Sequence, residues 1–166
     1  LIGNATKPGI YTLPGGSSIL SLLHAAGGLR EDGSYRSITH KRNNKIIQEI
    51  DLYDILIKGN LLFKSPLRSG DSVIINPSQR HVAISGGVNT PAIYELKDNE
   101  KLDDLVNLAQ GLSVSATNEI FIFNSSGITQ QVSPEDMNLT ELSHGDSVKI
   151  PLFSPITSKI LTVTLE

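Results

Sequence analysis

The sequence predicts an α+β fold with two tandem units, each a mixed sheet with one main helix packed across it. The first observation behind this prediction is a repeat, because residues 8–29 recur at 91–112 with matching residues 83 positions apart throughout. The second is that in each copy an extended run leads through a polar turn into a segment with apolar residues at helical spacing. The third is that strand-like runs follow each helix. A repeated sequence with these parts indicates a repeated fold.

Each repeated helix is expected to carry one apolar stripe. Apolar residues recur at i, i+3, i+4 and i+7 in both copies, namely Ile19, Leu22, Leu23 and Ala26 in the first and Leu102, Leu105, Val106 and Ala109 in the second. Ser17 or Ser18 can cap the first helix, because a hydroxyl accepts the first free amide protons. Asp98 or Asn99 is expected to cap the second helix. A single narrow stripe does not stabilise an isolated helix, so each helix needs a sheet to cover.

Both helices are expected to end at a glycine. Gly28 and Gly111 stand where a helix end needs left-handed backbone, which glycine adopts at little cost. In the second copy Gln110 precedes this glycine at the place of Gly27, and we interpret the change as a tolerated variant of the helix end.

The opening strands of the first unit can be inferred from the second. At the spacing of 83, residues 1–3 match the end of the alternating strand 81–85, so the first unit is expected to begin partway through its own first strand. Residues 9–13 are expected to return as the second strand of a hairpin. The shortened first strand would leave an unpaired sheet edge, which invites another strand. The alternating run 159–165 is expected to pair with such an edge, within this chain or in a neighbour.

The second half of each unit has its own order of elements. Runs 36–41 and 45–50 flank a pair of asparagines, which tolerate the positive φ of a tight hairpin. Asp51 can cap a short helix, and a turn with Gly and Asp leads into the last strand at 72–76. The second unit repeats these parts at 119–123, 128–132, 133–135 and 145–148. The last turns are only 75 positions apart, so the first unit has eight extra residues around 58–65.

The order of strand, strand, helix, strand, strand, short helix and strand is a β-grasp pattern. We therefore expect two tandem β-grasp domains, the first at 1–78 and the second at 79–154. Residues 155–166 are expected to be the first strand of a following repeat. The chain is accordingly expected to be a piece of a longer repeat protein.

Charge is distributed unevenly between the two units, although the net charge of the chain is −3. Residues 1–78 carry nine Lys and Arg against six acids, a balance of +3. Residues 79–166 carry five Lys and Arg against eleven acids, a balance of −6. This polarity can orient a head-to-tail contact between copies or attract an anionic ligand to the first unit. Independent drift of two repeated surfaces would produce the same asymmetry.

Composition and spacing exclude several kinds of chemistry. The absence of cysteine rules out disulfides, thiol catalysis and cysteine-ligated metal. No apolar run approaches the roughly 20 residues that span a bilayer. Four histidines lack metal-ligand spacing and are expected at surface or hairpin positions: His24, His40, His81 and His144. We therefore predict no catalytic group, metal site or cofactor, and Gly15 and Gly16 are expected to form a turn rather than a phosphate loop.

Three longer motifs occur in a fixed order along nearly the whole chain. They are PGIYTL before a helix ending in AAGGL, IDLYDILIKGN before LRSGDSVIINP, and HVAISGGVNTPAIYEL running into the second helix. Together they resemble the SLBB (soluble ligand-binding β-grasp) modules of bacterial polysaccharide export proteins of the Wza-like type. The phrases IDLYDILIKGN and VNTPAIYEL are most similar to long family members that string several modules together.

The resemblance implies a non-catalytic role in the periplasm, as part of an outer-membrane-associated protein that exports capsule, exopolysaccharide or biofilm sugar chains. It implies self-association into a ring or tube and a partner, the inner-membrane polysaccharide copolymerase. An export domain, signal peptide or lipid anchor would then lie before Leu1. We expect neither a nucleic-acid partner nor a membrane span in this part of the protein.

A basic cluster on the first hairpin is the main candidate for ligand binding. It comprises Arg36, His40, Lys41, Arg42 and Lys45, and at the spacing of 83 the second unit has apolar and aromatic residues there instead. The cluster could contact an anionic polysaccharide or an acidic neighbouring module, and a solvated hairpin is the alternative.

Two equivalent tyrosines are further candidates. Tyr11 and Tyr94 could stack on sugar rings, whereas packing against the adjacent helix is the alternative. Two functions therefore remain open from sequence. The modules either build the wall of an exporter through protein contacts, or they bind the exported carbohydrate directly.

Overall fold

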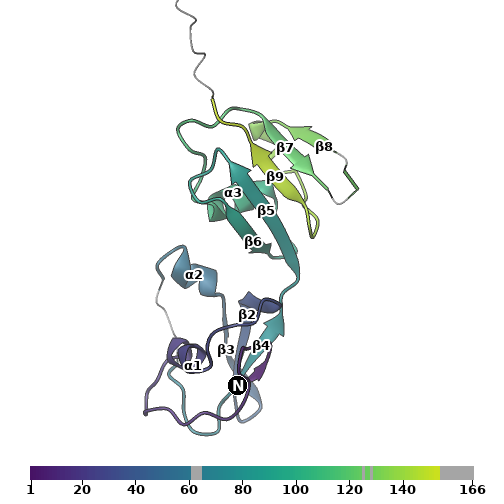
Figure 1. Ribbon diagram of the computed structural model, residues 1–166. Helices are drawn as coiled ribbons and strands as arrows, with labels where there is room; N and C mark the ends of the chain where they lie inside the picture. Colours follow the sequence, from purple (N-terminus) through teal and green to yellow (C-terminus); the bar gives the residue numbers. More distant parts are fainter. Residues whose placement is uncertain (61–64, 125, 128, 154–166) are drawn as a thin grey trace, which may run out of the picture.

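A computed structural model describes residues 1–60, 65–124, 126–127 and 129–153 and contains two sheets, each with its own helices (Figure 1). We call the first sheet and its helices the first module, and the second sheet and its helices the second module. β4 of the first module runs almost directly into β5 of the second, so the two modules lie end to end (Figure 1). The α+β class with two mixed sheets is confirmed.

The first module has four strands in the order β1-β4-β2-β3. Their bounds are β1 (Ile2–Gly3), β2 (Gly33–Arg42), β3 (Lys45–Ile50) and β4 (Ser72–Pro77). β1 is parallel to β4, and the other neighbours are antiparallel. Its helices are α1 (Ile19–Ala25) and α2 (Leu52–Leu56).

The second module has five strands in the order β6-β5-β9-β7-β8. Their bounds are β5 (Arg80–Gly86), β6 (Ala92–Leu96), β7 (Ile120–Phe123), β8 (Thr129–Val132) and β9 (Ser147–Ile150). β5 and β9 are parallel, as β1 and β4 are in the first module. Helix α3 (Leu102–Leu108) packs on this sheet, and a short 3₁₀ helix, η1 (Pro134–Asp136), follows β8.

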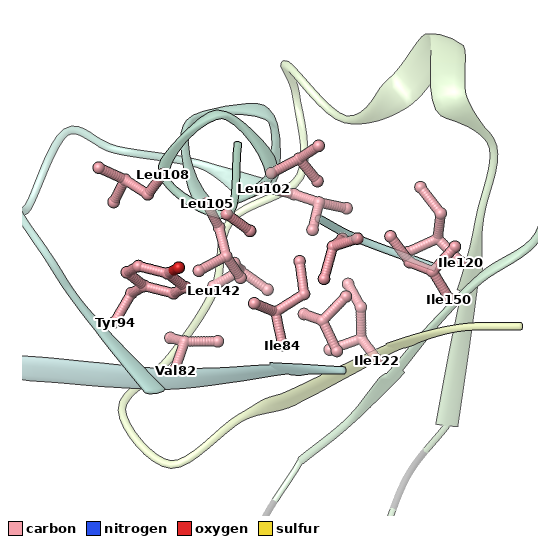
Figure 2. Close-up of a cluster of buried hydrophobic side chains, with 14 of the residues drawn as sticks. Val82, Ile84, Tyr94, Leu102, Leu105, Leu108, Ile120, Ile122, Leu142 and Ile150 are labelled. Atoms are coloured by element: carbon pink, nitrogen blue, oxygen red, sulfur yellow. The ribbon is translucent and has the colours of Figure 1, made fainter. Parts of the chain in front are cut away.

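Each module has its own hydrophobic core between its helix and its sheet. Every predicted stripe residue of α1 and α3 is buried. Figure 2 shows Leu105 of α3 projecting toward the strand residues Val82 and Ile84. The apolar periodicity of the sequence therefore identified the buried faces correctly.

Helix α3 begins later than the polar residues that we expected to cap it. Its N-cap is Lys101, and the Asp104 carboxylate accepts a hydrogen bond from the Lys101 amide at 2.9 Å. The amide of Leu102 donates to the Thr140 carbonyl at 3.1 Å. The prediction that Asp98 or Asn99 caps this helix is wrong, because a loop distant in sequence and the first helical turn satisfy these donors instead.

The other helix ends follow the sequence closely. Ser18 caps α1 and accepts a hydrogen bond from the Ser21 amide at 3.2 Å. The Gly28 amide donates back to the Leu23 carbonyl at 2.8 Å, which closes the helix. In the second module Gln110 has a φ of 63°, a left-handed conformation that is costly for a residue with a side chain.

Two glycines lie where the first strand of each module pairs with its last strand. Gly3 and Gly86 have φ values of 85° and 86°. A Cβ atom on Gly3 would lie 2.1 Å from the carbonyl oxygen of Ile75, and one on Gly86 would lie 2.0 Å from that of Ile150. Only glycine allows this approach of two backbones.

Residues 9–13 do not form the expected strand. Leu1 and Gly9 exchange two backbone hydrogen bonds, at 2.7 and 3.0 Å, at the place where Ile84 pairs with Ala92 in the second module. The remaining partners of β6 are Arg80 to Ala83, which match positions before Leu1. The prediction of a hairpin strand at 9–13 is therefore wrong for the described structure, in which the Leu1–Gly9 hydrogen bonds are not extended into a ladder.

The correspondence between the two hairpins is shifted by one residue from the sequence alignment. Gly33 pairs with Pro77, and Ala116, which follows Gly33 by 83 residues, pairs in the same way with Leu152. The register of β2 is irregular between Gly33 and Ile38. Beyond this point His40 pairs with Val73, and Ile122, which follows His40 by only 82 residues, pairs in the same way with Val148. His40 is therefore equivalent to Ile122. Our assumption of a constant spacing of 83 is wrong from this point onward.

Asn43 and Asn44 form the predicted hairpin turn, with φ values of 48° and 61°. Asp51 caps α2 as expected, accepting from the Tyr53 amide at 2.9 Å. The expected strand at 159–165 lies outside the described residues, as does the whole final segment 155–166 that we assigned to a further repeat. Within the described part of the chain, no helix is long and apolar enough to cross a membrane.

Candidate functional site

Arg36 of β2 lies at the junction between the two modules, with its side chain only 5% exposed. Its Nε donates to Asp51 at 3.1 Å within the first module. Its Nη1 and Nη2 donate to the two carboxylate oxygens of Glu100 in the second module, at 2.5 and 2.8 Å. Nη1 also donates to the Glu95 carbonyl at 3.0 Å. This planar group thus joins a helix cap in one module to a loop in the other through charge-assisted hydrogen bonds.

Glu95 of β6 extends the junction from the opposite side, with 5% of its surface exposed. Its carboxylate accepts from the Ser34 hydroxyl at 2.6 Å and from the Tyr35 amide at 2.9 Å. Its own amide donates to the Tyr53 hydroxyl at 3.0 Å. The carboxylate and the amide of Glu95 therefore both have partners across the junction, as buried polar groups require.

Aromatic rings and a second ion pair surround these hydrogen bonds. The Arg36 guanidinium lies over the Tyr53 ring, 4.9 Å from its centroid, and Tyr53 meets Tyr94 edge-on at 6.2 Å. Lys97 of the second module forms an ion pair with Asp51 at 2.7 Å. These contacts restrict the orientation of one module relative to the other, because Tyr53 meets Tyr94 and Asp51 meets Lys97 across the junction.

The titration behaviour at the junction follows from this packing. Burial by itself would lower the pKa of Arg36, but hydrogen bonding to Glu100 and the charges of Asp51 and Glu100 raise it above its ordinary value. Burial raises the pKa of the Tyr53 hydroxyl. Arg36 therefore stays charged and Tyr53 stays neutral across the physiological pH range.

An open cavity of about 480 Å³ lies beside the junction. It is lined mainly by polar and acidic side chains from both modules, including Ser34, Glu49, Asp51, Asp54, Lys97 and Asp98. Among the residues that the structure describes, no group of three or more His, Cys, Asp or Glu side chains could hold a metal ion.

A second buried network holds the hairpin of the first module against its last turn. The His40 ring is fully buried, and its Nε2 lies 2.7 Å from an Asp71 carboxylate oxygen. Arg42 donates to both oxygens of the same carboxylate, at 2.7 and 2.8 Å. Hydrogen bonding from Arg42, from the Arg68 amide and from His40 holds the pKa of Asp71 well below its usual range, against the opposing effect of burial.

The four histidines, which we expected at surface or hairpin positions, have different surroundings. His40 lies on the hairpin but is fully buried, whereas His24 is exposed. The rings of His81 and His144 come within 5.9 Å of each other, although they are far apart in sequence.

The structure does not bring the five predicted basic residues into one solvent-facing cluster. Arg36 is enclosed at the junction, and His40 and Arg42 bind the Asp71 carboxylate. Lys41 lies on the opposite side of β2 from His40, and Lys45 is exposed at the end of the hairpin. Strand alternation divides the cluster, because neighbouring residues point to opposite faces of a sheet.

The two predicted tyrosines have equivalent positions in their modules. The hydroxyl of Tyr11 donates to the Lys7 carbonyl at 2.5 Å, and that of Tyr94 donates to the Thr90 carbonyl at 2.8 Å. Tyr94 is 6% exposed and packs on Tyr53, whereas Tyr11 is partly exposed. Packing is therefore the observed role of the Tyr94 ring.

The faces of the two sheets opposite the helices differ in chemistry. We call them the outer faces. In the first module Thr39 and Lys41 of β2 lie on this face, since His40 between them is buried in the core side. In the second module the equivalent residues are Phe121 and Phe123 of β7, and Phe123 is 39% exposed. An alignment at a constant spacing of 83 does not show that Lys41 and Phe123 occupy equivalent positions in the two modules.

Comparison with known proteins bears on this architecture. The family model for the SLBB domain matches residues 2–48 and 81–133, one segment in each module. The chain belongs to the SLBB domain family. The resemblance of its motifs to SLBB modules of polysaccharide export proteins is thereby confirmed.

Two Escherichia coli proteins, each named Polysialic acid transport protein KpsD, are similar to this SLBB chain. Each is 34% identical to it over 98 residues, which are 58% of the chain and 17% of the relative. The aligned part thus spans about a sixth of each curated relative.

Proposed function

We propose that the two SLBB modules are a non-catalytic, load-bearing part of a polysaccharide export protein in the periplasm, associated with the outer membrane. The observation that carries this proposal is the junction around Arg36, where both modules contribute buried, fully partnered charges. A contact of this kind suits a fixed spacer better than a moving hinge, because separation would remove Glu100 and the Glu95 carbonyl from the buried Arg36 guanidinium. The likeness to KpsD supplies the link to polysaccharide transport.

In this proposal the rigid pair of modules contributes to the wall of a ring or tube and contacts the inner-membrane polysaccharide copolymerase. The opposite net charges of the two halves, +3 and −6, favour head-to-tail contacts between neighbouring copies. The test is cross-linking and light scattering of the full-length parent protein in membranes, with and without the copolymerase. A closed oligomer is the expected result, and a protein that remains monomeric under all conditions would contradict the proposal.

The outer faces favour a second candidate function, direct contact with the exported sugar chain. Phe121 and Phe123 offer aromatic surface to the apolar side of a sugar ring, with Thr129, Ser147 and Lys149 paired beside them. On the first module Lys41 offers a positive charge to an anionic sugar. This revises the basic hairpin and tyrosine site into a proposed glycan contact that spreads over Lys41, Lys45 and the two phenylalanines.

The glycan proposal can be tested by titration with two probes, a tetramer of sialic acid and neutral maltotetraose. NMR signals of β7 or of Lys41 should shift, and joint replacement Phe121→Ser and Phe123→Ser should weaken the interaction about tenfold. Val114→Ser is a matched control, because Val114 is fully exposed and lies outside these strands. If neither probe shifts any outer-face signal, the modules act through protein contacts alone.

A further inference from the structure

The turn before the last strand carries an aspartate in both modules, Asp71 in the first and Asp146 in the second. The residue after Asp71 pairs with Lys41, and the residue after Asp146 pairs with Phe123, the equivalent of Lys41. Each carboxylate also accepts a hydrogen bond from the amide three residues before it, at 2.9 and 2.7 Å. The two turns are therefore built alike, and they differ in what the rest of each module supplies to the carboxylate.

The surroundings of the two carboxylates differ in charge. In the first module Arg42 donates to both oxygens of Asp71, and His40 lies within hydrogen-bond distance of the same group. In the second module the equivalent residues are Asn124 and Ile122, which carry no charge. The carboxamide oxygen of Asn124 accepts from an amide two residues further along its own hairpin, at 3.1 Å. The second module therefore lacks the guanidinium that completes this turn in the first.

Asp146 is 7% exposed, and within the described part of the chain its carboxylate has one hydrogen-bond partner, the Ser143 amide. It lines a pocket of about 310 Å³ between the β7–β8 hairpin and the turn, together with Glu141 and His144. His144 supplies no positive charge there, because its Nδ1 accepts from the His81 amide at 3.1 Å and an imidazolium would carry a proton on that nitrogen. This buried carboxylate is incomplete, since such a charge is stable only beside a partner.

The first module offers a guanidinium with the opposite need. All five arginines lie within the described residues, and among those residues Arg68 alone has a side chain without a hydrogen bond or an ion pair. Arg68 is exposed on the turn beside Asp71. Residues 1–78 have a charge balance of +3 and residues 79–166 one of −6, so the two halves of neighbouring copies attract each other.

We propose that the pocket at Asp146 binds the guanidinium of Arg68 from a second copy of this chain. The planar group donates to the Asp146 carboxylate as Arg42 donates to Asp71 within the first module. Glu141 in the lining of the pocket adds a second negative charge. This inference rests on the self-association proposed above and names one contact within it.

NMR titration of the chain with acetyl-arginine-amide tests the pocket. The signals of Ser143 and Asp146 should shift to saturation. Acetyl-citrulline-amide, which has nearly the same shape but no charge, should bind at least about tenfold more weakly. Asp146→Asn should abolish the shifts, whereas the signals around Asp71 should stay in place because Arg42 already occupies that carboxylate.

Thermal unfolding tests whether Asp146 lacks a partner in the single chain. Asp146→Asn keeps an oxygen that accepts from the Ser143 amide and removes an unpaired buried charge, so the melting temperature should stay unchanged or rise. Asp71→Asn is the matched control and should lower it. Equal losses for the two variants would show that Asp146 already has a partner and would overturn the proposal.

Cross-linking tests the source of the guanidinium. The chain has no cysteine, so Ser69→Cys in one chain and Ser143→Cys in another, size-tagged chain place single thiols beside Arg68 and Asp146. A flexible bismaleimide should join the two chains into a mixed dimer. Addition of Arg68→Gln to the first chain should reduce the yield of this dimer by about tenfold, whereas Arg30→Gln should not.

The results distinguish this contact from the proposed function. A mixed-dimer yield that Arg68→Gln leaves unchanged would overturn the contact, even if the full-length parent protein forms a closed oligomer. Arginine-dependent NMR shifts together with that result would assign the pocket to a different basic partner, and their absence would remove the pocket as a site. A parent protein that stays monomeric while the chains form the Arg68-dependent dimer would contradict the proposed function and leave the contact intact.

Discussion

Replacement of Arg36 by methionine should separate the two modules energetically. The arginine makes four hydrogen bonds to Asp51, Glu100 and the Glu95 carbonyl, at 2.5 to 3.1 Å. Methionine keeps an apolar stem of similar length but donates to none of these acceptors. The variant therefore leaves two carboxylates at the junction without their main cationic partner.

The size of the effect follows from burial. The side chains of Asp51 and Glu100 are only 9% and 16% exposed, and removal of one partner from a buried pair costs about 3 to 5 kcal/mol. Lys97 still pairs with Asp51 at 2.7 Å, and its amide still donates to Glu100 at 2.9 Å. These remaining contacts place the expected loss of unfolding free energy near the lower limit, at about 3 kcal/mol.

Guanidinium denaturation followed by circular dichroism measures this loss. Arg30→Met is a matched control, because Arg30 forms an arginine–aspartate pair with Asp32 in the same module but both side chains are more than half exposed. The control should change stability very little, since exposed ion pairs are weak. NMR relaxation of the Arg36 variant should also show the two modules tumbling more independently than in the unmodified chain.

A double-mutant cycle with Glu100→Gln isolates the direct interaction. Because both changes disrupt the same contact, their effects should fall short of additivity by about 1 to 3 kcal/mol. An Arg36→Met loss no larger than that of Arg30→Met, or strict additivity in the cycle, would refute the role assigned to this junction.

Three further predictions concern individual positions. Asp71→Asn should remove stability that its depressed pKa supplies at neutral pH; the deficit should be full above the unfolded-state pKa of about 3.9 and shrink as the pH falls below it toward the folded pKa, in denaturation measured from pH 7 to pH 2. Gln110→Gly should raise the free energy of unfolding by about 1 kcal/mol by relieving a φ of 63°, whereas Gly27→Gln, at a φ of 76°, should lower it by a similar amount. Gly86→Ala should cost at least about 2 kcal/mol more than Gly111→Ala, since both have positive φ but only the first meets a backbone carbonyl at 2.0 Å; equal melting temperatures for the last two variants would contradict the clash.

Local sequence signals predicted much of the fold. The apolar stripes of α1 and α3, the Ser18 cap, the two asparagines of the first hairpin and the Asp51 cap all occur as expected. Each depends on residues within a few positions of one another, so a short stretch of sequence contains all the residues that form the feature.

The junction between the modules could not be predicted in the same way. Arg36 and Glu100 are 64 residues apart, and neither belongs to a short motif. In the sequence Arg36 resembled its basic neighbours on the hairpin, although it serves a different contact. The one signal available was a basic residue between Tyr35 and Ser37 near the start of a strand, which also describes many solvated positions.

The two hairpins show the same limit within a repeat. A spacing of 83 fits the helices, but an irregularity in β2 shifts the following strand by one residue. Because side chains alternate between faces, that single residue decides whether His40 corresponds to an outward Phe123 or an inward Ile122. The pairing with β4 selects Ile122.

Sequence alone is sufficient for the repeat, the helix stripes, the caps and the membership of a β-grasp family, because these features are encoded in local spacing. Three-dimensional packing decides which charges are buried and which faces stay open. These outcomes depend on partners 31 to 64 residues away, as with His40 and Asp71 or Arg36 and Glu100. Burial then converts a surface-like arginine into the link between two modules, since a desolvated charge is stable only beside its partners.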